Sequence, residues 1–130
     1  MTELTEATLD RAAGYRLIDE LQDERYRTEL LGGLERIAPG LPDYLVTTVF
    51  GGTYQREGLS RRDRQVANLA ALTALGGVEP QLTGHVETCL RVGMTAAEIV
   101  EVFVHLVPYV GIPKALAGLR AATAVLQGQP

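Results

Sequence analysis

The sequence predicts an all-α fold, and three observations support this prediction. Aromatic residues make up only 5% of the chain and Trp is absent, so aliphatic side chains must fill the core. Apolar residues recur at intervals of three and four, which is the spacing of one helix face. No stretch shows sustained apolar–polar alternation bounded by hairpin turns, as a strand would. We therefore expect about six or seven helices in a single domain over residues 1–130, with no linker dividing it.

The composition also excludes several classes of protein. A net charge of −4 argues against a nucleic-acid partner, because such proteins usually carry a basic face. The single cysteine excludes an internal disulfide and fits a reducing compartment. The N-terminus is acidic and lacks an apolar signal core, and no apolar run approaches the roughly 20 residues of a membrane span. We expect a soluble, cytoplasmic protein with no membrane partner.

The first part of the chain carries the weaker helix patterns. Residues 3–22 hold an apolar stripe that Gly14 interrupts. Residues 23–37 predict a short helix with a glycine pair near its middle. A third helix is expected over 42–50, with a proline in its first turn and two glycines after its end. Residues 53–59 read as a connector.

The next helix has a clearer start and stop. Ser60 and Asp63 form a pattern like a capping box before a helix over 61–75. After Gln65 this segment is apolar on nearly all sides, which predicts the central and most buried helix. Two glycines at 76–77 end it.

Three further helices complete the prediction. One begins near Pro80 and ends at 93, since proline is tolerated in a first turn. Thr95 and Glu98 form a capping box that opens the next helix, which meets Pro108. The last helix is expected over 114–126.

Both histidines and the only cysteine fall in the region of the last three helices. If two of these helices form a hairpin that turns near Met94, His85 lies nine residues before the turn and His105 eleven after it. At a rise of about 1.5 Å per residue, the two imidazoles then sit within roughly 3 Å of the same level. A shared site for both histidines is therefore geometrically allowed.

Each histidine also belongs to a stripe of polar side chains spaced four residues apart. Two imidazoles with a carboxylate, a phenol, an amide and a thiol are suited to proton transfer near neutral pH, where imidazole titrates. The two stripes are Gln81, His85 and Cys89 on one helix, and Glu101, His105 and Tyr109 on the other.

Ordinary structural explanations compete with each of these assignments. A helical histidine is more often hydrogen-bonded or partly exposed than catalytic, Cys89 suits a small buried position, and Glu101 suits solvent. Tyr109 suits the core with its hydroxyl at the surface, and Pro108 suits either a kink or a helix end. A zinc site from the two histidines and the cysteine lacks an evident fourth ligand, so we expect no metal.

A second cluster, of four arginines, lies between 56 and 64. In an acidic protein this cluster indicates an anion site or ion pairs between subunits, because arginine binds carboxylates in bidentate fashion. We expect Arg61 and Arg62 to be solvated, and Arg56 and Arg64 to bind substrate.

Spaced motifs across most of the chain resemble the carboxymuconolactone decarboxylase family, within the wider AhpD-like all-α superfamily. Taken together, the spacing of these motifs is specific, although no single one would be. They are Phe50-Gly-Gly-Thr-Tyr-Gln-Arg56, Gly58-Leu59 with Arg62 and Arg64, the helix from Leu69 to Gly76, His85, Gly93-Met-Thr95, Glu98-Ile99 with Glu101-Val102, His105, and Tyr109-Val-Gly-Ile-Pro113.

The resemblance implies small helical subunits that assemble as trimers or hexamers, and decarboxylation of a lactone acid with no metal or organic cofactor. The peroxidase branch of the superfamily uses a Cys-x-x-Cys motif, but this chain has Val78 and Gln81 at those places, which rules out that thiol chemistry. Three places depart from the decarboxylase pattern: Gln81 where Glu is usual, Pro108 ahead of the Tyr-x-Gly-x-Pro motif, and Thr53-Tyr54.

From these residues we expect a cofactor-independent decarboxylase or isomerase, a lyase acting on a small carboxylated lactone such as 4-carboxymuconolactone. His85 or His105 donates a proton. The other histidine, with Glu101 or Tyr109, orients the donor or stabilises the enolate oxygen, and Arg56 or Arg64 binds a carboxylate. Tyr54, Gln81 and Cys89 complete the expected pocket.

Two alternatives remain beside this hypothesis. One is an enzyme of the same fold that decarboxylates, isomerises or cyclises a larger, polyketide-like secondary metabolite. The other is a non-enzymatic module for oligomerisation or ligand binding, in which His85 and His105 point to separate places.

Overall fold

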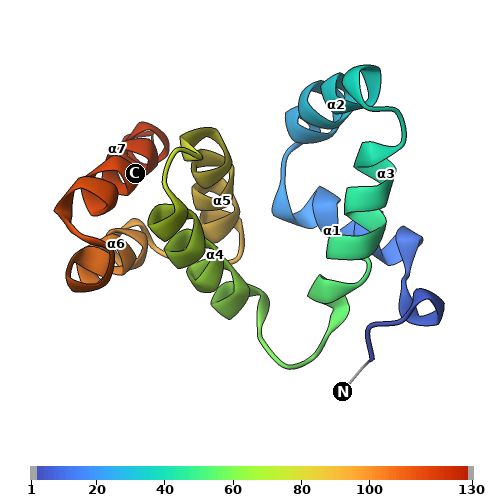
Figure 1. Cartoon of the computed structure of the whole chain (residues 1–130), viewed down its shortest axis with the longest axis horizontal. Helices are drawn as coiled ribbons and strands as arrows, with labels where there is room; N and C mark the ends of the chain where they lie inside the picture. Colours follow the sequence, from blue (N-terminus) through green and yellow to red (C-terminus); the bar gives the residue numbers. More distant parts are fainter. Residues whose placement is uncertain (1–2, 129–130) are drawn as a thin grey trace. The chain divides into compact units, whose positions relative to one another are not determined.

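The structure, a computed structural model, describes residues 3–128 and is built from helices joined by short turns (Figure 1). Within that range it contains seven α-helices, with short π- and 3-10 segments and no strand. The all-α prediction is therefore confirmed. The chain forms two compact units, Met1–Ser60 and Arg61–Pro130, each of which is described by itself. The expectation of a single domain stays a prediction.

None of the helices in the described range is long and apolar enough to cross a membrane.

In the first unit, helical segments cover 26–37 and 41–50, close to the helices expected over 23–37 and 42–50, whereas the helix expected over 3–22 is α-helical only from Arg11. A 3-10 turn at Glu6–Thr8 precedes α1 (Arg11–Leu21), which begins where the Asp10 carboxylate accepts a hydrogen bond from the Ala13 N–H. Two π-helical segments, two short α-helices and a 3-10 helix follow, joined directly or through tight turns. These elements are η2 (Tyr26–Leu31), α2 (Gly32–Ile37), α3 (Leu41–Leu45), η3 (Val46–Phe50) and η4 (Thr53–Gln55).

Gly14 does not break α1 but allows the close packing of α1 on η3. A Cβ atom at Gly14 would lie 2.6 Å from the carbonyl oxygen of Val46 and 2.9 Å from the amide nitrogen of Gly51. Ile18 of α1 packs with Leu31 and Val46 in the small core of this unit. The glycine that interrupts the apolar stripe in the sequence is therefore a contact position.

The second unit is a bundle of four longer helices. These are α4 (Arg61–Leu75), α5 (Glu79–Arg91), α6 (Ala96–Val110) and α7 (Ile112–Leu126). The sequence predicted each of them to within about two residues at either end. Gly111, with a φ of +89°, separates α6 from α7, a backbone conformation that favours glycine.

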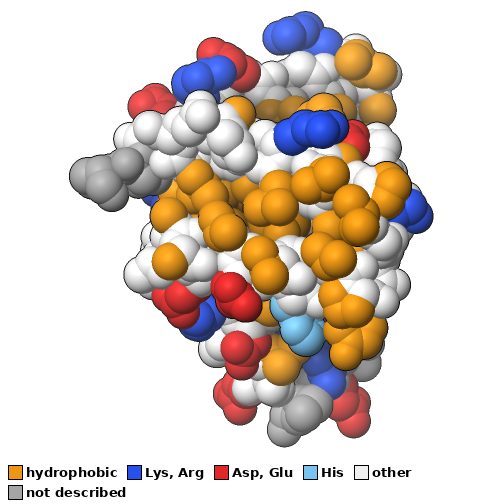
Figure 2. All heavy atoms as spheres, turned by 90° about the vertical axis from the view of Figure 1, so that its left-hand side faces the viewer, with side chains coloured by type: hydrophobic (Ala, Val, Ile, Leu, Met, Phe, Trp, Pro, Cys, Tyr) orange, Lys and Arg blue, Asp and Glu red, His pale blue; other side chains and the backbone are white. Residues whose placement is uncertain are grey.

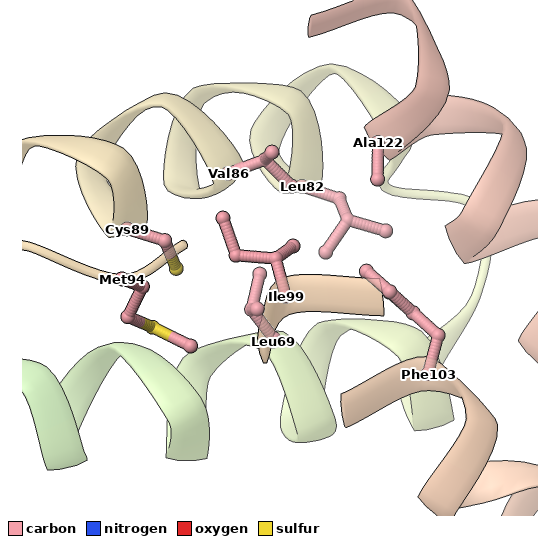
Figure 3. Packing of buried hydrophobic residues seen from close by; sticks show 8 residues of the cluster. All are labelled: Leu69, Leu82, Val86, Cys89, Met94, Ile99, Phe103 and Ala122. Carbon is pink, nitrogen blue, oxygen red and sulfur yellow. The ribbon is translucent and has the colours of Figure 1, made fainter. Parts of the chain in front are cut away.

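The core of this unit receives side chains from all four helices and from the α5–α6 turn. Figure 3 shows these side chains meeting between the helices; they are Leu69, Leu82, Val86, Cys89, Met94, Ile99, Phe103 and Ala122. α5 packs mainly on α7 and α4, and α6 packs mainly on α7.

The prediction that the 61–75 helix is the most buried one was wrong. On α4 only Gln65, Leu69 and Thr73 are buried, fewer than the four buried residues of α5. These three residues recur every fourth position, so α4 presents a single narrow stripe to the core. Its remaining alanines favour the helix without being buried, which is why an apolar sequence overstated the burial of this helix.

Candidate functional site

His85 lies on α5 in contact with a buried glutamine of α4. Its Nδ1 atom is 2.9 Å from the Oε1 atom of Gln65, a side chain that is only 1% exposed. The spacing of apolar residues along α5 explains the position of His85, because Leu82, Val86 and Cys89 face the core. His85 stands beside this apolar stripe, so its ring is half-buried at the edge of the core.

Burial controls the charge of His85. Desolvation lowers the pKa of its imidazole from the ordinary value of 6.5, because a charged ring is disfavoured away from water. The neutral ring therefore dominates at pH 7. A neutral imidazole with one nitrogen fixed by a hydrogen bond is suited to proton transfer.

The two other members of the α5 stripe have different surroundings. Cys89 is fully buried, and burial raises the pKa of its thiol to about 12. The thiol therefore stays protonated, as the prediction of a small buried hydrophobe requires. Gln81, one turn before His85, is exposed.

The α6 stripe lies on the surface. Glu101, His105 and Tyr109 are all exposed. The rings of His105 and Tyr109, one helical turn apart, have centroids 5.3 Å apart at an interplanar angle of 37°. The structure therefore brings these two together, and the competing explanation of Tyr109 as a core residue does not hold, since its side chain is 74% exposed.

The two stripes do not meet in the second unit. α5 and α6 make few contacts with each other, because each packs chiefly on α7. Among the described residues, His85 pairs with Gln65 and His105 with Tyr109, and no contact joins the two imidazoles. The spacing of the two histidines from the turn near Met94 predicted only their level along the helix axes. The assumption that α5 and α6 pack side by side was incorrect.

Two arginines at the start of α4, Arg62 and Arg64, have different surroundings. Arg62 forms an ion pair with Glu98 at the start of α6, although the sequence indicated a solvated side chain. Its guanidinium lowers the pKa of Glu98 to about 2, assisted by hydrogen bonds from Thr95. The expected capping box between Thr95 and Glu98 is confirmed. Arg64, a predicted substrate ligand, is half-buried.

Two predicted pocket residues belong to the first unit. The ring of Tyr54 lies against Phe50, with centroids 4.9 Å apart, and Tyr54 is half-buried. Arg56 is also half-buried in the connector that follows η4.

A hollow of about 370 Å³ opens between α4, α5 and α7. It is lined mainly by apolar and glycine residues, with Thr73 on one side and Lys114 and Glu79 among its polar groups. Lys114 donates a hydrogen bond to the carbonyl of Ala74. None of the candidate residues named from the sequence lines this hollow.

An apolar surface covers the outer side of α6 and α7 (Figure 2). On α6, Val100, Val104 and Val107 are 38%, 48% and 37% exposed, and they recur on one helix face. Ile112 and Leu116 at the start of α7 are also exposed. We refer to these five residues as the α6–α7 apolar face.

Within residues 3–128, no three His, Cys, Asp or Glu side chains lie close enough together to hold a metal ion.

Gln65 is the functional candidate that the sequence reading missed. One feature of the sequence indicated that Gln65 is buried, since Gln65, Leu69 and Thr73 recur every fourth position on one face of α4. A polar side chain on a buried stripe needs a hydrogen-bond partner. The identity of that partner depends on how α4 and α5 pack, which the sequence pattern does not state.

Comparison with known proteins gives a family and two relatives. Residues 39–124, well over half of the chain, match the model of the family described as "Carboxymuconolactone decarboxylase family". An uncharacterised 15.0 kDa protein from Paracoccus denitrificans is 32% identical over 93 residues, covering 71% of this chain and 69% of the relative. A 4-carboxymuconolactone decarboxylase from Acinetobacter baylyi is 27% identical over 114 residues, covering 88% of this chain and 84% of that protein.

Proposed function

This chain belongs to the carboxymuconolactone decarboxylase family, and from that premise we propose that it is a cofactor-independent decarboxylase or isomerase. Its substrate is a small carboxylated lactone, similar to that of the relative named 4-carboxymuconolactone decarboxylase. The observation that carries this proposal is the half-buried His85, held by the buried Gln65. Such a neutral, oriented imidazole is what proton transfer at carbon requires.

The chemistry needs an electron sink and a proton. When CO₂ leaves, the electron pair of the broken C–C bond passes into the conjugated lactone carbonyl, and the resulting dienolate takes a proton at carbon. An imidazole near neutral pH is suited to such a transfer. We assign the proton transfer of the decarboxylation or isomerisation to His85, because its burial and its hydrogen bond distinguish it from the exposed His105.

The remaining candidates have supporting roles in this proposal. Arg64, in the same unit as His85, binds a carboxylate that the product retains, since a guanidinium matches a carboxylate in charge and geometry. His105, Glu101 and Tyr109 are on the surface of α6, beside the valines of the α6–α7 apolar face. We propose that this face joins copies of the chain in a homo-oligomer, in which these three side chains lie at an interface.

The test is turnover of purified protein with 4-carboxymuconolactone, followed by CO₂ release and by the absorbance of the lactone. We expect His85→Gln to lower kcat/KM by about 100-fold or more, within the range for a lost acid–base group. His105→Gln, an exposed histidine on α6, is the matched comparison and should lose less. Undiminished activity in both variants would exclude histidine-based proton transfer.

A second candidate is an enzyme of the same family acting on a larger, more apolar metabolite. It is favoured by the largely apolar hollow between α4, α5 and α7, whose lining includes no arginine. Lining by apolar side chains is typical of sites for larger organic ligands. A panel of lactone acids of increasing size distinguishes the two, because this candidate predicts higher kcat/KM for the larger substrates.

The separate positions of His85 and His105 are what a non-enzymatic module predicts. Absence of turnover across the whole panel, together with saturable binding of a lactone acid, would favour this reading.

A further inference from the structure

Gln65 is among the most deeply buried polar side chains of the described chain. It is 1% exposed on α4, and its Oε1 atom lies 2.9 Å from Nδ1 of His85 on α5. Burying an amide without a hydrogen-bond partner is costly, so this contact accounts for a polar residue on the core stripe of α4. The same contact decides which nitrogen of the imidazole holds the proton.

The direction of the hydrogen bond follows from the chemistry of the two groups. An amide oxygen only accepts hydrogen bonds, so Nδ1 of His85 must donate and therefore carries a hydrogen. A neutral imidazole has a single ring N–H. The other nitrogen, Nε2, is then unprotonated and presents a lone pair.

We infer that Gln65 is a positioning residue that fixes His85 in the Nδ1-protonated tautomer, so that His85 enters the reaction as a proton acceptor and not as a donor. This inference rests on the proposed function, because it gives a direction to the proton transfer assigned there to His85. It also assigns a role to a residue that the family resemblance did not single out.

The Nδ1-protonated tautomer of His85 favours isomerisation over a decarboxylation in which His85 donates a proton directly. As Nε2 takes a proton from a substrate carbon next to the lactone carbonyl, the C–H bond breaks and its electron pair is delocalised as an enolate. The imidazolium then returns this proton to another carbon of the enolate, which moves the double bond and restores His85. In a decarboxylation, His85 delivers a proton to carbon only after it has first taken one from solvent.

The charged and titratable groups around His85 do not oppose this assignment. On α5, Gln81 is neutral, and the Cys89 thiol stays protonated because burial raises its pKa. On α4, Arg62 is paired with Glu98 of α6. Desolvation is the only cause of the lowered pKa of His85, so no neighbouring charge holds a second proton on the ring.

The direct test is long-range ¹H–¹⁵N correlation NMR on uniformly ¹⁵N-labelled protein at pH 7.5, which identifies the protonated nitrogen of each imidazole. The chain contains two histidines, so a His105→Gln variant leaves the His85 ring as the only signal. We expect the Nδ1-protonated pattern for His85. A predominantly Nε2-protonated ring in the wild-type protein would overturn the inference.

Two substitutions at Gln65 test its role, with a matched control on the same helix. Gln65→Leu should shift His85 toward the Nε2-protonated tautomer, because no acceptor then faces Nδ1. Gln65→Glu should keep the Nδ1-protonated form and raise the His85 pKa by about one unit or more, since an adjacent carboxylate favours the charged ring. Thr73→Val, another buried polar position of α4, should leave the His85 spectrum unchanged.

These measurements separate the two proposals. An unchanged tautomer in Gln65→Leu would overturn the role of Gln65, whatever the activity. If that variant does not fold, the wild-type tautomer and the His85 titration in Gln65→Glu decide instead, and a His85 pKa unmoved by the new carboxylate would overturn it. The expected NMR result combined with no turnover of any lactone acid would reject the proposed function and support the positioning of His85.

Discussion

Glu98 combines two structural roles at the start of α6. Its carboxylate accepts the Thr95 N–H in the capping box and also pairs with Arg62 of α4. Both interactions favour the ionised form, with the Arg62 hydrogen bond as the largest contribution, and they lower the Glu98 pKa from 4.5 to about 2. A single side chain thus fixes the helix start and joins it to the neighbouring helix.

The stability of the protein should therefore respond to acid through Glu98. Because its folded-state pKa lies below the unfolded value, its contribution is present above pH 4.5 and is lost as the pH falls toward 2. We expect the Tm of the wild-type protein to fall more steeply over this range than that of Glu98→Gln, which keeps the capping geometry. Thermal melts between pH 2 and 6, with the exposed Glu87→Gln as control, measure the difference.

If the slopes of wild type and Glu98→Gln coincide while Glu87→Gln matches both, the Arg62–Glu98 pair does not stabilise the fold.

The pH dependence of turnover should report on His85. Burial lowers its pKa from 6.5, so a base at this position is mostly unprotonated at neutral pH. We expect kcat/KM to reach a plateau at neutral to alkaline pH and to fall as the pH drops below the folded-state pKa. Rates measured from pH 5 to 8 check this, and a loss of activity as the pH rises through this range would identify His85 as the donor.

At the scale of elements, glycines determine how closely helices approach. Gly118 of α7 faces Phe103 of α6, and a Cβ atom there would lie 2.7 Å from Cε1 of the ring. The ring is fully buried in the core shown in Figure 3 and cannot move aside without disturbing its neighbours. The α6–α7 contact therefore depends on the absence of a side chain at this position.

Gly118→Ala should destabilise the protein by about 1–3 kcal/mol through overpacking. Gly84→Ala on α5 is a matched control, because a Cβ there meets nothing within 4 Å. The control should be neutral or should stabilise by about 0.5–1 kcal/mol, since alanine favours a helix interior more than glycine. Urea denaturation gives both free energies, and equal values for the two variants would contradict the packing argument.

The elements of the second unit could be predicted because their ends have local chemical causes. Thr95 and Glu98 start α6, and the glycines at 76–77 and 111 have positive φ angles that end helices. In the first unit, Pro42 and the glycines at 51–52 also marked a helix, but the packing of this unit had no such local signal. The burial of Gly14 against η3 depends on contacts between segments distant in sequence, so periodicity alone could not identify its role.

The candidate site was predictable only in part for the same reason. A histidine on α5 beside an apolar stripe is evident from spacing, but its hydrogen bond to Gln65 depends on how α4 packs on α5. Similarly, spacing placed His85 and His105 at one level, while the packing of α5 and α6 on α7 keeps their contacts separate. Distances along a helix follow from sequence, whereas the choice of neighbour follows from packing.

At the scale of the whole molecule, the α6–α7 apolar face is the surface most suited to association. Figure 2 shows a contiguous apolar patch on this side of the second unit, and monomeric proteins rarely leave a large apolar patch uncovered. Its α6 portion consists of valines on a face about 100° around the helix from the core residues Ile99 and Phe103. α6 is therefore apolar on two sides, as expected for a helix placed between its own core and another subunit.

A charge placed in this face should dissociate the assembly. We expect the wild-type protein to be oligomeric and Val104→Lys to shift it toward the monomer, because a lysine at the centre of an apolar interface is poorly solvated. Glu87→Lys places the same residue at an exposed position of α5 and should leave the mass unchanged. Light scattering after size-exclusion chromatography measures the masses, and a monomeric wild-type protein would refute the assembly.

The burial of Cys89 makes the chain well suited to site-specific labelling. Its thiol is inaccessible and has a pKa of about 12, so maleimide or spin-label reagents react poorly with it under mild conditions. A new cysteine on the surface of α6 can therefore be modified without replacing the natural one. A fluorophore at such a position follows subunit exchange in real time, with the core sulfur left in its native packing.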